Sequence, residues 1–137
     1  TGMPIEYSGL DSLRPHSIAV VRGYSYDSAF DTAAGLSKVP VLEFTMGARM
    51  LAAGRVQLTL EDELVAQFHL NRDLREIRNS VEFVEVPLSE NGLHILVRRS
   101  HPLHRQIVRE FNAHIEAMRE DGSYQRVFRR HGLSGDD

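Results

Sequence analysis

The chain of 137 residues lacks cysteine and tryptophan, and no run of apolar residues approaches the length of a membrane span. The absence of cysteine excludes disulfide bonds, thiolate catalysis and thiolate metal ligands. A membrane-spanning helix needs about 20 predominantly apolar residues in succession. What is present is ordinary globular composition, with 42% hydrophobic and 26% charged residues, at a length typical of one domain.

An excess of positive charge is also lacking. Sixteen Lys and Arg side chains are set against 19 Asp and Glu side chains, which gives a formal net charge of -3. Proteins that bind nucleic acids neutralise phosphates with a broad basic surface. We therefore expect no nucleic acid among the partners.

Five short apolar or β-branched runs predict strands, over residues 17–22, 38–44, 56–60, 81–86 and 93–97. Helical spacing of apolar residues predicts helices over residues 25–35, 46–53, 61–71 and 102–121, with a last short helix around 124–131. Strands that alternate with helices indicate an α/β fold, a mostly parallel sheet flanked by helices on both faces. The last two helices would form a C-terminal helical extension.

Single residues mark the ends of these elements. Ser25 or Asp27 is expected to cap the first helix, and Thr45 the second, which Gly54 would close. Pro40 cannot donate a ladder hydrogen bond, so its strand is expected at an edge of the sheet.

The Gly23-Tyr24-Ser25 segment lies between the first strand and the first helix. In open parallel sheets, ligands bind at the carboxyl ends of the strands. Glycine allows close backbone approach, a helix N-terminus offers free N–H groups, and Ser25 adds a hydroxyl. A plain turn with a helix cap explains the same residues. The further glycines of a dinucleotide fingerprint and the lysine of a P-loop are missing.

The Glu61-Asp62-Glu63 segment opens the third helix at the same edge of the predicted sheet. Carboxylates in a first turn are stabilised by the helix dipole, which is sufficient to explain them. Alternatively, Asp62 faces the edge and binds a ligand cation such as an ammonium group. Asp62 and Ser25 would then contact opposite charges of one zwitterion.

The seven histidines do not indicate a metal site. His101 and His104 have a spacing that could share a metal, but no carboxylate lies at a supporting position nearby. The others are scattered along the chain. No Gly-x-Ser-x-Gly motif and no isolated pair of carboxylates is present. We therefore expect neither a metal nor a cofactor, and a protein that is not an enzyme.

Four segments in order resemble bacterial extracellular solute-binding proteins of the polar amino-acid class, which have the type II periplasmic binding protein fold. They are the strand-Gly23-Tyr-Ser25-helix unit, Arg49-Met-Leu-Ala-Ala-Gly-Arg-Val56, Leu60-Glu-Asp-Glu63, and the C-terminal residues 111–132 with Phe111-Asn112, Asp121-Gly-Ser-Tyr124 and Val127-Phe-Arg-Arg-His-Gly132. The resemblance extends from about Leu10 to His131.

The resemblance implies a lobe of a two-lobed clamp that closes around an amino acid, as part of a periplasmic ABC uptake system with a membrane permease as partner. Residues 1–16 would be a leading segment, residues 17–98 the second lobe, and residues 99–137 C-terminal helices that pack on a first lobe. It further implies ligand contacts from Gly23, Tyr24 and Ser25, and an amino-group contact from Asp62.

Some residues depart from the family pattern. Gln57 stands where the family usually has an aspartate, and Tyr24 where a small hydroxyl residue is usual. Two lobes of ordinary size do not fit in 137 residues, so the arginine that grips the ligand carboxylate would belong to a lobe not contained here. We expect little ligand binding by this chain alone.

Two other functions use the same fold. One is the ligand-sensing domain of a receptor or sensor kinase, and the other is an enzyme resembling cyclohexadienyl dehydratase. The C-terminal helices present an apolar stripe at residues 107, 111, 115 and 118. Because large exposed apolar patches tend to acquire partners, we expect homodimers through these helices.

Overall fold

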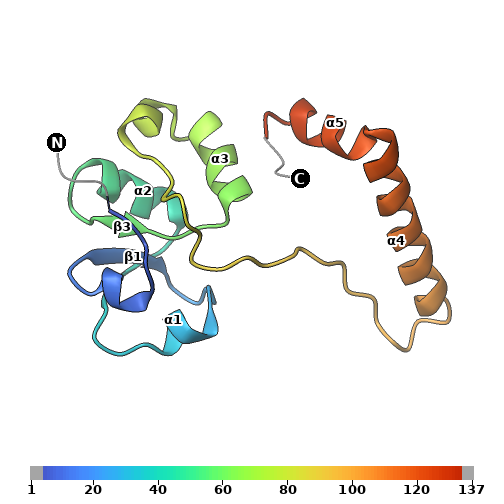
Figure 1. The fold of residues 1–137 in the computed structure, drawn as a ribbon, viewed down its shortest axis with the longest axis horizontal. Coiled ribbons are helices and arrows are strands. Elements are labelled where there is room, and N and C mark those ends of the chain that lie inside the picture. Colours follow the sequence, from blue (N-terminus) through green and yellow to red (C-terminus); the bar gives the residue numbers. More distant parts are fainter. Residues whose placement is uncertain (1–4, 134–137) are drawn as a thin grey trace. The chain divides into compact units, whose positions relative to one another are not determined.

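The computed structural model describes residues 5–133 and contains a three-stranded sheet with helices around it (Figure 1). The elements in chain order are η1 (Leu10–Leu13), β1 (Ser17–Val21), α1 (Ser28–Thr32), β2 (Ser37–Val41), α2 (Phe44–Ala52), β3 (Leu58–Thr59), α3 (Glu63–Asn71), η2 (Arg75–Ser80), α4 (His104–Asp121) and α5 (Ser123–Arg130). The chain divides after Glu90 into two compact units.

The sheet has the strand order β2-β1-β3, and both pairings are parallel. Ser17 pairs with Ser37 at the start of β1, and Val21 with Val41 at its end. The predicted α/β class with a parallel sheet is therefore confirmed. Pro40 lies in the edge strand β2, as its missing N–H requires.

Side chains of β1 alternate between the two faces of the sheet, as the two-residue period of a strand dictates. Ile18 is fully buried on one face, in a cluster with Leu13 and Phe30. Ala19 and Val21 point to the other face, where they join a second cluster. That cluster contains Val41, Phe44, Ala48, Val56, Ala66 and Leu74. Full burial of a side chain such as Ile18 or Phe30 contributes roughly 1.5–3 kcal/mol, so the central strand anchors this unit.

Gly47 allows α2 to lie close against the sheet. A Cβ atom built at this position would meet Thr59 Oγ1 at 3.0 Å and the Ala19 Cβ at 3.2 Å. Both are tighter than ordinary van der Waals contact, so a larger residue would push the helix away from β1 and β3.

Of the expected helix ends, Asp27 and Gly54 were right and Thr45 was wrong. The Asp27 side chain accepts a hydrogen bond from the Phe30 N–H and caps α1, while Ser25 does not. Helix α2 begins at Phe44 with Glu43 at the N-cap position, and Thr45 instead donates its hydroxyl to Glu43 Oε1 at 2.8 Å. Thr45 lies inside the first turn of the helix, where its hydroxyl can no longer accept from the N–H groups ahead.

The strands predicted over residues 81–86 and 93–97 are not formed. Both segments are without regular secondary structure, and Phe83, Leu93 and Leu96 are exposed. Strand propensity expresses how well a residue fits against neighbouring strands. These segments pair with no strand in the described part of the chain, so their β-branched and apolar side chains have no neighbouring strand to pack against.

The second unit contains two consecutive helices. Helix α4 ends at Gly122, whose positive φ of 80° forms the left-handed cap that glycine favours. Asp121 then accepts hydrogen bonds from the Ser123 N–H and hydroxyl, which starts α5 at once. These two helices are confirmed where the sequence predicted them. No helix among residues 5–133 is long and apolar enough to cross a membrane.

Candidate functional site

The carboxyl ends of β1 and β3 bring two distant segments to the same edge of the sheet. Ile18 pairs with Leu58 and Ala19 with Thr59. If this parallel register is continued by two residues, Glu61 lies beside Val21. The turn after β1 and the residues before α3 therefore meet at the edge where ligands bind in sheets of this kind. In Figure 1 both connections leave the sheet toward α1 and α3.

The turn after β1 is built around Gly23. Its φ is 80°, a left-handed conformation that side-chain-bearing residues adopt at a cost, and the Tyr24 N–H donates to the Val21 carbonyl at 3.2 Å. The turn leaves Tyr24 with 56% of its surface exposed. Nothing lies within 4 Å of a Cβ built at Gly23, so the backbone here is open to a ligand.

Tyr26 ties this turn to the sheet. Its hydroxyl accepts a hydrogen bond from the Val21 N–H at 2.7 Å, and its ring packs edge-on against Phe30 at 5.9 Å between centroids. The Tyr24 ring lies 6.1 Å away at an angle of 52°. The two tyrosines thus form a small aromatic surface, half-buried at Tyr26 and exposed at Tyr24.

Ser25 is held by an acidic side chain of α1. The Ser25 hydroxyl donates to Asp31 Oδ2 at 2.9 Å, and the Tyr26 N–H donates to both carboxylate oxygens of Asp31. Because its hydrogen is engaged, the Ser25 oxygen can offer lone pairs only. A ligand group that binds there has to be a hydrogen-bond donor.

Asp62 is the N-cap of α3. Its Oδ1 accepts from the Leu64 and Val65 N–H groups at 3.0 and 3.1 Å, and the side chain is exposed. A role at the start of the helix is one of the two explanations that the sequence allowed for the acidic segment at residues 61–63. Asp62 Oδ2 takes no part in the cap, so a cation can bind to it without breaking these bonds.

Glu61 is the less exposed of the two neighbouring carboxylates. Its Oε1 accepts from the Asp62 N–H at 2.8 Å. Burial raises the pKa of Glu61, the Asp62 N–H opposes this, and the Asp62 charge adds to it. Burial disfavours the charged form of a carboxylate, and a cation placed beside it stabilises that charged form.

The two segments interact electrostatically. Burial raises the pKa of the Tyr26 hydroxyl, its bond with the Val21 N–H opposes this, and the negative charge of Glu61 raises it further. The charge of Glu61 thus contributes to the raised pKa of Tyr26, although the two residues are far apart along the chain. The edge combines aromatic surface with negative charge, which suits a positively charged group.

The structure places all four predicted site residues at this edge, with Gly23, Tyr24 and Ser25 in one turn and Asp62 in the other. The sequence reasoning passed over Tyr26, Asp31 and Glu61. Glu61 was identifiable in principle, because it directly precedes the residue that was chosen. The position of Tyr26 follows only from its bond to the end of β1.

Gln57 lies at the opposite edge of the sheet. Its side-chain Oε1 accepts a hydrogen bond from the Ser17 N–H at 2.8 Å, and its backbone N–H donates to the Ser17 carbonyl. This side chain accepts the hydrogen bond of the first N–H of β1, whereas the candidate site is formed where β1 ends. Gln57 therefore takes no part in the carboxyl edge where the candidate site is formed.

The histidines near α4 are used locally. His101 Nδ1 accepts from the Leu103 N–H at 3.1 Å, and His104 Nδ1 lies 3.1 Å from the His101 carbonyl oxygen. Within residues 5–133, no group of three or more potential ligands is arranged to hold a metal ion.

Comparison of the chain with protein-family models, with curated proteins and with solved structures gave no match.

Proposed function

We propose that residues 17–90 provide one side of a binding site for an amino acid or a related small molecule with an ammonium group. The observation that carries the proposal is the register of β1 and β3, which brings Glu61 to the end of β1, where the Tyr26 hydroxyl accepts a hydrogen bond from the Val21 N–H. The resemblance of the sequence to amino-acid-type solute-binding proteins points to the same edge and the same class of ligand.

The ammonium group is the part of the ligand that these residues suit best. Glu61 and Asp62 supply negative charge, and the Ser25 oxygen can only accept hydrogen bonds. The faces of Tyr24 and Tyr26 attract cations through their ring electrons. Asp62 Oδ2 and Glu61 would each form a charge-assisted hydrogen bond, which is stronger than a neutral one.

The residues of the proposed site suit only the cation of the ligand, and this determines the expected affinity. A complete pocket buries most of a small ligand. The edge described here offers groups for the cation, while a group for the ligand carboxylate would come from a second lobe. In this proposal the chain acts in a periplasmic ABC uptake system, where closure of two lobes excludes water and a membrane permease receives the ligand.

Isothermal titration calorimetry of the chain against a panel of polar amino acids tests the proposal of a half-site. We expect dissociation constants near 1 mM, or about 4 kcal/mol of binding free energy, because only part of the ligand is contacted. The matched controls are carboxylic acids of the same shape without the amino group, which should bind more weakly. Micromolar affinity would overturn the half-site, and equal affinity for the deaminated analogues would overturn the assignment of the ammonium group.

A further inference from the structure

Helix α4 carries its charges in an unusual order along one face. Arg105 and Arg109 lie in its first half, and Glu116 and Glu120 in its second half. The helix dipole favours acidic residues near the N-terminus and basic ones near the C-terminus, which is the reverse of this arrangement. Arg105 and Arg109, like Glu116 and Glu120, are also like charges four residues apart, which repel each other within a helix.

Within the described residues of their own unit, 91–133, these four side chains have no ion-pair partner. Other charged groups of the same helix are engaged: Glu110 Oε1 accepts from Gln106 at 3.0 Å, and Arg119 lies over the Tyr124 ring at 5.0 Å. The order of charge on this face is therefore not explained by contacts among residues 91–133.

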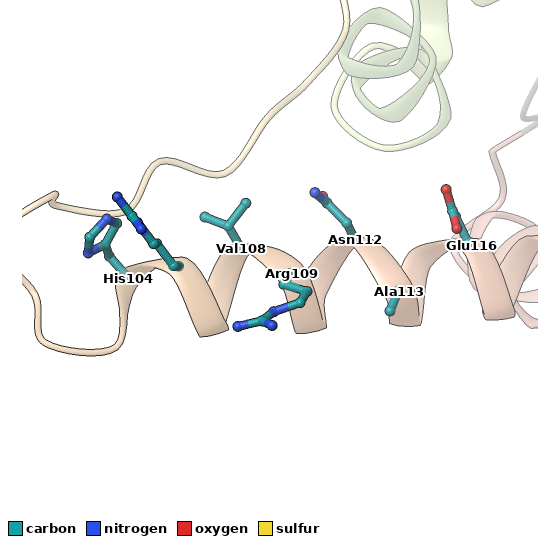
Figure 2. A pocket seen from close by; sticks show the side chains of 7 residues that line it. His104, Val108, Arg109, Asn112, Ala113 and Glu116 are labelled. Carbon is teal, nitrogen blue, oxygen red and sulfur yellow. The ribbon is translucent and has the colours of Figure 1, made fainter.

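The same face contains a shallow open groove between two rows of side chains. One row consists of His104, Val108, Asn112 and Glu116, and the next row includes Arg109 and Ala113 (Figure 2). Each row follows the four-residue spacing that forms ridges on a helix. A groove between two such ridges is where a ridge of another helix packs.

We propose that this groove binds α4 of a second copy of the chain in the antiparallel direction. The helix runs from His104 to Asp121, so its midpoint falls between Asn112 and Ala113. If two helices cross at their midpoints, Arg109 lies opposite Glu116 of the second copy, and Arg105 lies opposite Glu120. Two-fold symmetry repeats both pairs.

The register that pairs these charges is also the register in which the two helices overlap over their whole length. That length is about 27 Å for the 18 residues of α4. Val108, 41% exposed, and Ala113 supply apolar surface in the groove. Asn112 lies beside the two-fold axis, and a polar residue at such a position fixes register. A parallel pair would place Arg against Arg and Glu against Glu, so the charges specify the direction as well.

Charge exchange in the full chain tests the pairing, with the dimer dissociation constant measured by sedimentation equilibrium at low salt. Arg109→Glu and Glu116→Arg should each weaken the dimer by about tenfold, because a symmetric attraction becomes a repulsion. The combined variant R109E/E116R restores complementary pairs and should return to within about threefold of wild type.

The matched control is R109E/E120R, which has the same composition and net charge as R109E/E116R but places like charges opposite each other. Because both pairs become repulsive, it should associate more weakly than either single variant. Circular dichroism of each variant confirms that the helices are formed. The proposal is overturned if the chain is monomeric at high concentration and low salt, if the single variants associate like wild type, or if R109E/E116R is no stronger than R109E/E120R.

Discussion

The Val21 N–H donates a 2.7 Å hydrogen bond to the Tyr26 hydroxyl, which fixes the turn after the central strand to the end of that strand. The bond spans five residues and crosses the Gly23 turn. It holds Tyr26 at the end of β1, the edge that the strand register also gives to Glu61, whose charge raises the pKa of Tyr26. The Tyr26 hydroxyl therefore joins the Tyr24 N–H and the Asp31 carboxylate in holding the turn at the candidate site.

Tyr26→Phe removes the acceptor of this bond and leaves a partly buried N–H without its partner. We expect the free energy of unfolding to fall by about 1–2 kcal/mol, the cost of an unsatisfied donor. Urea denaturation followed by circular dichroism measures it. Tyr24→Phe is the matched control. Because the Tyr24 side chain is exposed, this change should lower the free energy of unfolding only slightly. Equal effects of the two changes would show that the Val21 bond does not hold the turn.

Glu61→Gln should change how stability depends on pH. Burial raises the pKa of Glu61 above its ordinary value of 4.5, so the folded state binds the proton more tightly than the unfolded state. This contribution is fully present below the unfolded value and is lost as the pH rises through the folded value. The advantage of Glu61→Gln over wild type should therefore grow as the pH is raised from about 4.5 toward neutrality.

The same substitution tests the contact between the two segments. Loss of the negative charge should lower the pKa of Tyr26, which can be followed by NMR of labelled tyrosine rings at alkaline pH. Glu63→Gln, on the exposed side of the same turn, is the control and should leave Tyr26 unchanged. An unaltered Tyr26 titration in Glu61→Gln would mean that the two groups are too distant to form one site.

We assign Asp62 two functions, the cap of α3 and a contact with the ligand, and two substitutions separate them. Asp62→Ala removes the cap of α3 and should cost about 1 kcal/mol of stability. Asp62→Asn retains an oxygen that can accept from the Leu64 and Val65 N–H groups, so its stability should stay close to that of wild type. It removes the charge, however, and ligand binding should weaken. If binding is the same in Asp62→Asn and wild type, Asp62 is a helix cap and nothing more.

Hydrogen exchange distinguishes the true strand from the two segments that only resemble strands. Amides of β1 lie in a ladder between two neighbours and should be strongly protected. Residues 81–86 and 93–97 have no ladder and should exchange rapidly. Slow exchange in these segments of the monomeric chain would contradict the absence of strands.

The parts of the fold that were predicted correctly depend on local chemistry. The apolar run of β1, the Asp27 cap and the end of the long helix at residue 121 are each decided within a few residues. The strands expected at residues 81–86 and 93–97 failed because a strand needs a neighbour, which a single segment does not reveal. The relation between Tyr26 and Glu61 was missed for a similar reason. It arises from the register of β1 and β3, and from a hydroxyl bonded to a strand end.

The most direct test of the ligand site is a two-dimensional NMR titration of the labelled chain with the amino acid that binds best. We expect shifts at millimolar ligand, concentrated in the amides of residues 23–26 and 61–63, that become weaker in the variant carrying both Glu61→Gln and Asp62→Asn. Shifts that lie elsewhere, or that are the same in this variant as in wild type, would contradict a site at the carboxyl edge of the sheet.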